Sequence, residues 1–210
     1  PNPNRVFSGF GDDQITGSVG TDFIQGGGGD DVIDGGAGND TLDGEAGDDR
    51  LLHGEGLDQF IGGSGVDTLD YSELSTDVHA DLSVLVDGFS NVTVDPEGPD
   101  VEVDQVKEVE NIVAGAGDDQ LTGDREDNRL EGGDGDDTLV GGGGNDELLG
   151  GEGVDTADYS LSTTGITTDL SLDSDNVVVD ESNIDTLSGI ERVVGSDFDD
   201  DMRGGDEDDT

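Results

Sequence analysis

Residues 26–43 read GGGGDDVID-GGAGNDTLD, two consecutive units of nine residues. Each unit has glycine at the first, second and fourth places, aspartate at the sixth and an aliphatic residue at the eighth. The same frame extends without a gap over residues 8–70 and gives seven units. A second run of five units covers residues 114–158, and a third begins at Gly195. Self-similarity at a short fixed period predicts a solenoid, in which successive units stack on one another.

The composition alone argues against ordinary folding. The chain has 210 residues, with 55 acidic and 7 basic side chains, a formal net charge of −48 and only 29% hydrophobic residues. Chains of this kind usually stay disordered, because they bury too little apolar surface to offset the entropy of ordering. The repeat indicates a fold, so we expect a cation to neutralise the chain and allow it to form.

The same numbers exclude several classes of function. A net charge of −48 repels phosphate, so we expect neither a nucleic-acid partner nor an anionic membrane surface. No apolar run approaches the roughly 18 residues of a membrane-spanning helix. The absence of cysteine excludes disulfides and thiolate metal sites.

The unit predicts a turn followed by a very short strand. Glycines at the first, second and fourth places allow positive φ and close approach of backbones, which suits a tight turn of about six residues. The remaining three residues form a strand with one apolar side chain pointing inward. Two units then complete one coil with a strand on each side. Turns two units apart stack about 4.8 Å apart, which is the spacing of neighbouring strands.

This stacking brings the sixth-place carboxylates together. In the first two runs they are Asp13, Asp22, Asp31, Asp40, Asp49, Asp58, Asp67, Asp119, Asp137, Asp146 and Asp155. Stacked carboxylates repel unless a cation lies between them. Carboxylates and glycine carbonyls are hard oxygen donors, which suit Ca²⁺ better than Mg²⁺ with its tight octahedron. Zinc prefers His or Cys, and the chain has two His and no Cys.

The units resemble the GGxGxDxUx nonapeptide of RTX (repeats-in-toxin, hemolysin-type) calcium-binding proteins. This resemblance implies an all-β fold, a right-handed parallel β-roll. It also implies secretion through a bacterial type I system and folding outside the cell in calcium. In the family the sixth-place aspartate supplies side-chain oxygens and the turn supplies backbone carbonyls. That role carries over to the eleven residues above and, in the third run, to Asp200 and Asp209.

Two units depart from the pattern. GDREDNRLE has Glu126 at the fourth place and Asn128 at the sixth, and GSDFDDDMR has Phe198 at the fourth. We expect no complete calcium site in these turns, because a positive φ is costly for a residue with a side chain. If turns two units apart share an ion, a run of n units gives n − 2 sites, or about eight over the chain.

The stretches between the runs resemble each other. Both begin with an Asp-Tyr-Ser motif, at Tyr71 and Tyr159, and both end in related runs, Val109-Glu110 and Ile190-Glu191. Alternating residues predict strands at Val78, Ala80, Leu82 and Val84, at Ile166, Thr168, Leu170 and Leu172, and in the β-branched runs at Val92, Val94 and 177–179. We expect links at 71–113 and 159–194 that continue or cap the roll. Ligand or partner binding by the links is the alternative.

The ends resemble interior stretches of the chain. Residues 1–7 look like the end of a preceding link, and residues 195–210 like the start of a third, truncated roll. We therefore expect a window from a larger protein, with neighbouring modules in the parent chain.

The remaining chemistry-bearing residues have ordinary interpretations. We expect His53 and His79 to be solvated surface residues, Tyr71 and Tyr159 to cap or pack against the runs, and Arg125 and Arg129 to balance local acids. Aspartates at the fifth or ninth place, such as Asp12, Asp34 and Asp43, should be solvated or lie outside the metal's direct ligands. No catalytic motif is present, so we expect no enzyme activity from this chain.

Three hypotheses for function remain. The first is a calcium-binding module of a larger secreted bacterial protein, extracellular or at the cell surface, that folds on extracellular Ca²⁺ after export. The second is a structural protein of a surface layer, adhesin stalk or matrix, whose rolls self-assemble with calcium. The third is an accessory calcium-binding region of a secreted polysaccharide-modifying enzyme.

Overall fold

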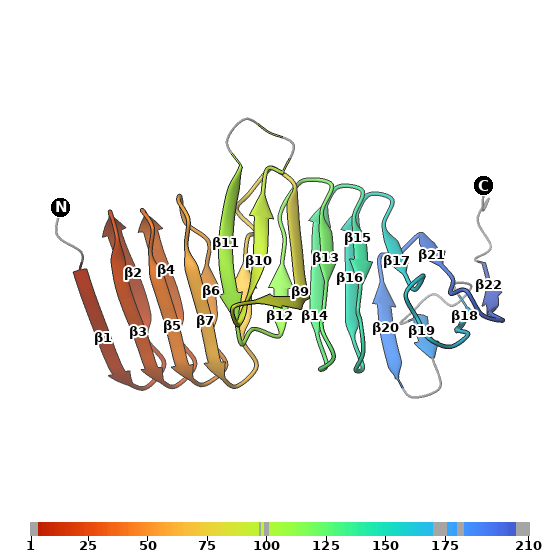
Figure 1. Ribbon diagram of the computed structural model, residues 1–210, viewed down its shortest axis with the longest axis horizontal. Helices are drawn as coiled ribbons and strands as arrows, with labels where there is room; N and C mark the ends of the chain where they lie inside the picture. The colour runs from red at the N-terminus through yellow and green to blue at the C-terminus, as the bar shows by residue number, and fades with distance from the viewer. Residues whose placement is uncertain (1–3, 97, 99–100, 170–175, 180–182, 205–210) are drawn as a thin grey trace.

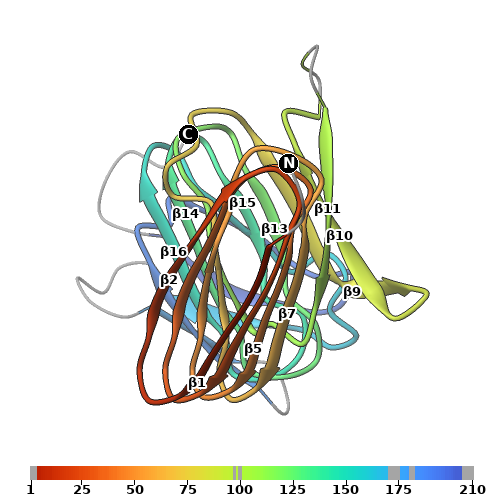
Figure 2. The ribbon, with the colours of Figure 1, turned by 90° about the vertical axis from the view of Figure 1, so that its left-hand side faces the viewer.

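The computed structural model describes residues 4–96, 98, 101–169, 176–179 and 183–204. Figure 1 shows a solenoid whose coils stack along the long axis, with the two chain ends at opposite ends. The described residues form strands and turns and contain no helix, and therefore none that could cross a membrane. The end-on view in Figure 2 shows each coil as a flattened loop with a strand on either side. The expected parallel β-roll is confirmed.

The strands form two sheets of eleven. The first sheet contains, in spatial order, β1 (Asn4–Phe10), β3 (Asp22–Gly28), β5 (Thr41–Ala46), β7 (Gln59–Ser64), β11 (Glu102–Lys107), β10 (Phe89–Val94), β9 (Val78–Val86), β13 (Gln120–Thr122), β15 (Thr138–Val140), β17 (Thr156–Asp158) and β21 (Arg192–Val194). The second contains β2 (Gln14–Val19), β4 (Val32–Ala37), β6 (Arg50–Leu52), β8 (Thr68–Asp70), β12 (Asn111–Val113), β14 (Arg129–Asp134), β16 (Glu147–Glu152), β20 (Ile184–Ser188), β19 (Asn176–Val179), β18 (Thr167–Asp169) and β22 (Asp201–Arg203). Consecutive units therefore alternate between sheets, as the nine-residue frame predicts.

The eighth-place residues make the core. Strands of the runs pair in parallel with an offset of 18 residues, so Ile24 lies beside Leu42 and Ile33 beside Leu51. All four side chains have 0% of their surface exposed. Each fully buried side chain of this size contributes roughly 1.5–3 kcal/mol of hydrophobic stabilisation. The inside of the roll is thus a single apolar stack only one residue wide per strand.

The turn glycines do two different jobs. At the second and fourth places the backbone has positive φ, as at Gly27 (113°) and Gly29 (120°). The first-place Gly26 has no positive φ, contrary to our expectation; there, a Cβ atom would collide with the Asp31 carboxylate. Glycine at the first place is therefore required for close packing and not for an unusual backbone conformation.

Both links are built into the sheets. In the first link, β11 and β12 make one further coil of the roll beside β7 and β8. The antiparallel pair β9 and β10 inserts into the first sheet, between β11 and β13. In the second link the antiparallel strands β18, β19 and β20 join the second sheet. The two insertions lie in opposite sheets because each link's first strand follows the alternation of the run before it.

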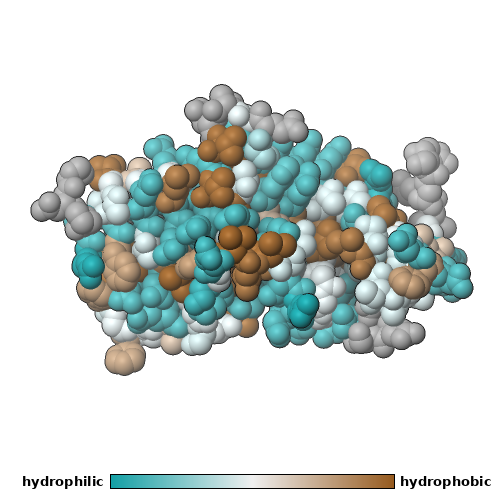
Figure 3. Space-filling model, in the orientation of Figure 1, coloured by the Kyte–Doolittle hydropathy of each residue, from teal (hydrophilic) through white to brown (hydrophobic). Residues whose placement is uncertain are grey.

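Most of the strands expected in the links are present. Val78, Ala80 and Leu82 are buried on β9, but Val84 is 54% exposed, because β13 pairs only with residues 79–81 and β9 continues beyond the roll. Val92 and Val94 are buried on β10, and Ile166 and Thr168 are buried around β18. Residues 177–179 form β19, whereas Leu170 and Leu172 lie outside the described residues. Figure 3 shows apolar patches near the middle of an otherwise mostly hydrophilic face.

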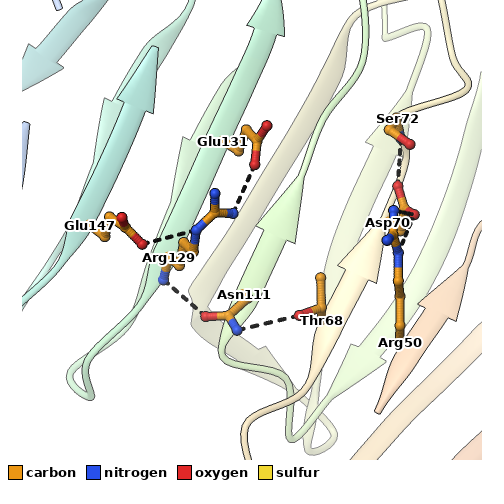
Figure 4. A network of polar contacts seen from close by, with 8 residues as sticks. All are labelled: Arg50, Thr68, Asp70, Ser72, Asn111, Arg129, Glu131 and Glu147. Atoms are coloured by element: carbon orange, nitrogen blue, oxygen red, sulfur yellow. Dashed lines mark hydrogen bonds and ion pairs between the residues drawn. The ribbon is translucent and has the colours of Figure 1, made fainter. Parts of the chain in front are cut away.

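A polar network on the second sheet joins the first link to both runs (Figure 4). Asn111 on β12 donates to the Thr68 hydroxyl on β8 (3.3 Å) and accepts from the Arg129 backbone on β14 (3.0 Å). The Arg129 guanidinium contacts Glu131 at 2.8 Å and Glu147 at 2.9 Å. Arg129 therefore balances local acids, as expected. Exposed pairs of this kind contribute little individually, about 0–1 kcal/mol.

Candidate metal centre

The sixth-place carboxylates form a ladder along the turns. Asp31 Oδ1 accepts the backbone N–H of Asp13 at 2.7 Å, Asp49 Oδ1 accepts that of Asp31 at 2.8 Å, and Asp67 Oδ1 accepts that of Asp49 at 2.8 Å. Each carboxylate therefore holds the turn that lies 18 residues earlier. This hydrogen bond fixes the side chain and uses one of its two oxygens.

The second oxygen of most of these carboxylates has no hydrogen-bond partner. Among the described residues, eight sixth-place aspartates have a fully buried Oδ2 atom without one: Asp31, Asp40, Asp49, Asp67, Asp119, Asp137, Asp146 and Asp155. A buried oxygen of a carboxylate left unpaired is costly, and native proteins rarely tolerate one without an ion or water. The eight oxygens thus mark positions where positive charge is missing.

Backbone carbonyls face the same positions. The space where a Cβ atom on Gly26 would lie is bordered by Asp31 Oδ2 and, at 3.0 Å, by the carbonyl oxygen of Gly44. At Gly44 the equivalent borders are Asp49 Oδ2 and the Gly62 carbonyl, the latter at 2.7 Å. A carboxylate oxygen and a carbonyl from the unit two ahead therefore converge beside each of these glycines. An all-oxygen donor set of this kind suits Ca²⁺.

Electrostatics support the same conclusion. Burial, with neighbouring carboxylates adding to it, raises the pKa of Asp58, Asp119 and Asp146 to about 7. The same causes raise the pKa of Asp67 and Asp137 to about 6. The pKa values of Asp40, Asp49 and Asp155 are also raised, again first by burial. The ladder therefore resists carrying its full negative charge unless a cation neutralises it.

Four of the predicted metal-binding aspartates have other surroundings. The Ser8 hydroxyl donates to Asp13 Oδ2 at 2.7 Å, and the Ser18 hydroxyl donates to Asp22 Oδ2 at 3.0 Å. Burial raises the pKa of Asp22, but hydrogen bonds from Ser18 and Asn4 outweigh it, so the net shift is downward. At Asp200 the Ser196 hydroxyl donates to Oδ1 at 2.7 Å. Asp58 lies beside His53, and Asp209 lies outside the described residues.

The irregular unit at residues 123–131 satisfies its own side chain. Asn128 Oδ1 accepts the backbone N–H of Asp124, and Asn128 Nδ2 donates to the Glu110 carbonyl, both at 2.8 Å. The amide group thus supplies a donor to a turn carbonyl where the other units present a bare oxygen. This geometry agrees with the expectation of no complete calcium site there. At the other irregular unit, Phe198 is exposed.

Fifth-place residues form a second ladder that the sequence did not suggest. Asp12 Oδ1 accepts the backbone N–H of Asp30 at 3.0 Å, and Asp30 Oδ1 accepts that of Asp48 at 2.9 Å. This ladder runs opposite to the sixth-place ladder, from each unit to the one 18 residues later. We had expected these side chains only to be solvated. Their signal in the sequence is the recurrence of Asp or Asn at the fifth place.

The links supply ladder members as well. Asp104 Oδ1 accepts the backbone N–H of Asp58 at 2.9 Å, and Glu110 accepts that of Asp67 at 2.8 Å. In the second link, Asp185 and Glu191 do the same for Asp146 and Asp155, at 3.0 and 2.8 Å. The matching sequence signal is an acidic residue six positions before the Val-Glu or Ile-Glu pair in both links. The stack of turns therefore continues through the links, so the n − 2 count does not describe it.

His53 is not the solvated residue that we expected. Its side chain is only 7% exposed, because the Tyr71 ring lies 4.8 Å from it and link strand β11 brings Asp104 to 3.2 Å from Nδ1. Tyr71 itself is buried in the core and donates to Asp104 Oδ2 at 2.8 Å, which agrees with its expected packing role. His79 lies on β9 with a half-buried side chain.

Comparisons with known proteins agree with this geometry. A family model described as the RTX calcium-binding nonapeptide repeat (4 copies) matches residues 3–33, 16–51, 25–60, 43–72, 109–133, 122–157 and 185–210. A comparison with curated proteins found no match.

One solved structure with similarity is the extracellular lipase LipA from Serratia marcescens, at 19% sequence identity and a TM-score of 0.29. The match covers 85% of this chain but only 38% of the lipase, so the chain spans well under half of that protein's length. The family model, in contrast, matches well over half of the chain. The repeat in its sequence, the parallel roll and the matched model together show that this chain belongs to the RTX calcium-binding nonapeptide repeat family.

Proposed function

We propose that this chain is a calcium-dependent folding module of a larger secreted bacterial protein. The observation that carries the proposal is the set of eight buried Oδ2 atoms that have no hydrogen-bond partner among the described residues. Each belongs to a carboxylate whose Oδ1 is already held by the neighbouring turn. The chain has thus positioned one oxygen per unit and left it for a cation.

The free energy of folding depends on that cation. At neutral pH the roll stacks ionised carboxylates in a chain whose formal net charge is −48, and burial removes water from them. Calcium, when bound, supplies positive charge opposite these oxygens and accepts the flexible coordination that carboxylates and carbonyls offer. Because the unfolded chain has no preformed site, the binding free energy becomes folding free energy.

The same charge supports export before folding. Without divalent cations, mutual repulsion keeps the polyanion extended and soluble. Extracellular calcium modules commonly bind at about 10⁻⁴–10⁻³ M, a level that the bacterial exterior offers. We therefore place the folded module outside the cell or at the cell surface, where calcium supplies the folding signal.

Circular dichroism tests the folding step. In metal-free buffer at about pH 7.5 we expect a coil-like spectrum, and at about 1 mM Ca²⁺ a β-rich one. Mg²⁺ at the same concentration should leave the spectrum coil-like, because it gives up its water reluctantly. A β-rich spectrum without any divalent metal would reject the proposal.

A matched pair of variants tests the assignment of the ligands. Asp137→Asn removes an Oδ2 without a partner and keeps the Oδ1 that accepts from Asp119. Asp136→Asn makes the same change of charge at the exposed fifth place next to it. Calcium stoichiometry from isothermal titration should fall by about one ion in the first variant and stay unchanged in the second. Equal losses in both variants would show that only overall charge matters.

A further inference from the structure

One turn of the roll departs from the glycine rule and buries an imidazole in the ladder. His53 takes the first place of unit 53–61, where a Cβ is normally excluded by the sixth-place carboxylate. Its Nδ1 atom is fully buried and has no hydrogen-bond partner. It lies 3.2 Å from Asp104 Oδ2. A buried ring nitrogen left in this state needs a proton or a metal ion to satisfy it.

Two buried carboxylates face this nitrogen. Ligand atoms of His53, Asp58 and Asp104 all lie within 4.8 Å of one another, and across the described part of the chain no other group of three His or acidic side chains does so. Asp58 is 3% exposed and Asp104 is 0% exposed. The ladder turns elsewhere bring carboxylates together with carbonyls, so this site differs in its donors as well as in its burial.

Neighbouring side chains hold the ligands in place. The Tyr71 hydroxyl donates to Asp104 Oδ2 at 2.8 Å, and Asp104 Oδ1 accepts the backbone N–H of Asp58 at 2.9 Å. The Tyr71 ring also packs against the imidazole at a centroid distance of 4.8 Å. On the other side of the ring, Glu102 lies 3.9 Å from His53 Nε2. Oriented carboxylates and a fixed imidazole are the supports that metal ligands typically have.

We propose that His53, Asp58 and Asp104 form a site for a transition-metal ion of the Zn²⁺ class, separate in its chemistry from the calcium positions. One imidazole nitrogen and two carboxylates are ligands that Zn²⁺ binds in tetrahedral sites, whereas Ca²⁺ takes oxygen ligands. Imidazole also favours the later first-row divalent ions over Ca²⁺ and Mg²⁺. The site would join the first run to the first link, because Asp104 lies on β11 and the other two ligands belong to unit 53–61.

The second link provides an internal comparison. There, Asp185 Oδ1 accepts the backbone N–H of Asp146 at 3.0 Å, and the Tyr159 hydroxyl donates to Asp185 Oδ2 at 2.9 Å. This arrangement repeats that of Asp58, Asp104 and Tyr71, but the first place holds Gly141 in place of histidine. The imidazole is therefore an addition to a geometry that the roll otherwise builds without it.

A protonated His53 is the main rival to a metal ion. An imidazolium would pair with Asp104 and act as a built-in cation at this turn. The two alternatives differ in their response to zinc, since only an unprotonated ring nitrogen can coordinate it. The chain's only other histidine, His79, gives a control in the same molecule.

The test uses the full chain folded in calcium at about pH 7.5, so it is independent of whether calcium is what folds it in the cell. Zn²⁺ is added, and the ring resonances of both histidines are followed by NMR while affinity is measured by isothermal titration. We expect the His53 signals alone to shift, with saturation at one ion. His53→Gly, which restores the glycine of the repeat, should weaken this binding by at least about tenfold, whereas His79→Gln should leave it unchanged.

Several results would overturn the proposal. Zinc that binds equally well to His53→Gly is held only by surface carboxylates. Unshifted His53 resonances in the unmodified chain reject the site without any variant, and they favour the imidazolium. If the chain stays unfolded in calcium, the proposed function fails; the zinc titration then decides this site separately, because the His53 signals report on it in either case.

Discussion

Asp49 Oδ1 accepts a 2.8 Å hydrogen bond from the backbone N–H of Asp31, while Asp49 Oδ2 is buried without a hydrogen-bond partner. The two oxygens of one carboxylate thus have separate roles. The first joins turns 18 residues apart, and the second faces a turn carbonyl, where only a cation or a proton can relieve the repulsion. The pKa of Asp49 is raised, first by burial, as this arrangement requires.

Acid should partly replace calcium in folding the chain. Burial raises the pKa of Asp58, Asp119 and Asp146 to about 7 in the fold, against about 3.9 for an unfolded aspartate. The folded state therefore binds more protons than the unfolded state between about pH 4 and 7, so stability without calcium falls as pH rises through this window. We expect circular dichroism in metal-free buffer to show more β structure at about pH 4.5 than at about pH 7.5.

The same window should govern calcium affinity. Protons and calcium compete for the same oxygens, so the calcium concentration at half-folding should rise as pH falls from about 7 to 5. A midpoint that does not change with pH over this range would contradict the ladder's raised pKa values.

Alanine at a first-place glycine should damage one site, whereas alanine at a third-place glycine should not. In Gly44→Ala the new Cβ would collide with Asp49 Oδ2 and lie 2.7 Å from the Gly62 carbonyl oxygen. We expect a loss of about 1–3 kcal/mol in stability with calcium present, and one fewer bound ion. Gly143→Ala is the control, since its Cβ meets nothing closer than 3.8 Å. Equal effects on thermal unfolding would show that the first-place glycine is not needed for close packing.

Asn128→Asp should create a calcium site in the irregular unit. It replaces an amide that donates to the Glu110 carbonyl with a second carboxylate oxygen facing that carbonyl. We expect the calcium-free fold to be less stable and calcium stoichiometry to rise by one ion. Unchanged stoichiometry in a folded variant would mean that Glu126 at the fourth place also prevents binding.

Gly141→His should add a second zinc site. The backbone there has no positive φ, so histidine is allowed, although the Asp146 side chain must move aside. The variant would combine an imidazole with Asp146 and Asp185, as His53 combines with Asp58 and Asp104. Titration with Zn²⁺ should then show two imidazole-dependent ions instead of one. A folded variant that binds only one would indicate that the surroundings of His53 contain something that the second link lacks.

The repeat frame predicted the coil, its apolar stack and the sixth-place aspartates, because each follows from periodicity alone. The fifth-place ladder was missed since a short side chain at a turn can reach either neighbour, and spacing does not say which. The burial of His53 depends on β11, which arrives from residues 102–107 and pairs with β7 across an insertion that no periodicity describes. The exposure of Val84 likewise reflects where β13 ends, which alternation along β9 does not reveal.

The central claim is that the buried Oδ2 atoms are calcium ligands, and anomalous X-ray diffraction from crystals grown in calcium tests it most directly. The account predicts anomalous peaks next to Asp31, Asp40, Asp49, Asp67, Asp119, Asp137, Asp146 and Asp155, and none next to the Asn128 amide. An ordered roll from calcium-containing crystals without peaks beside these oxygens would contradict it.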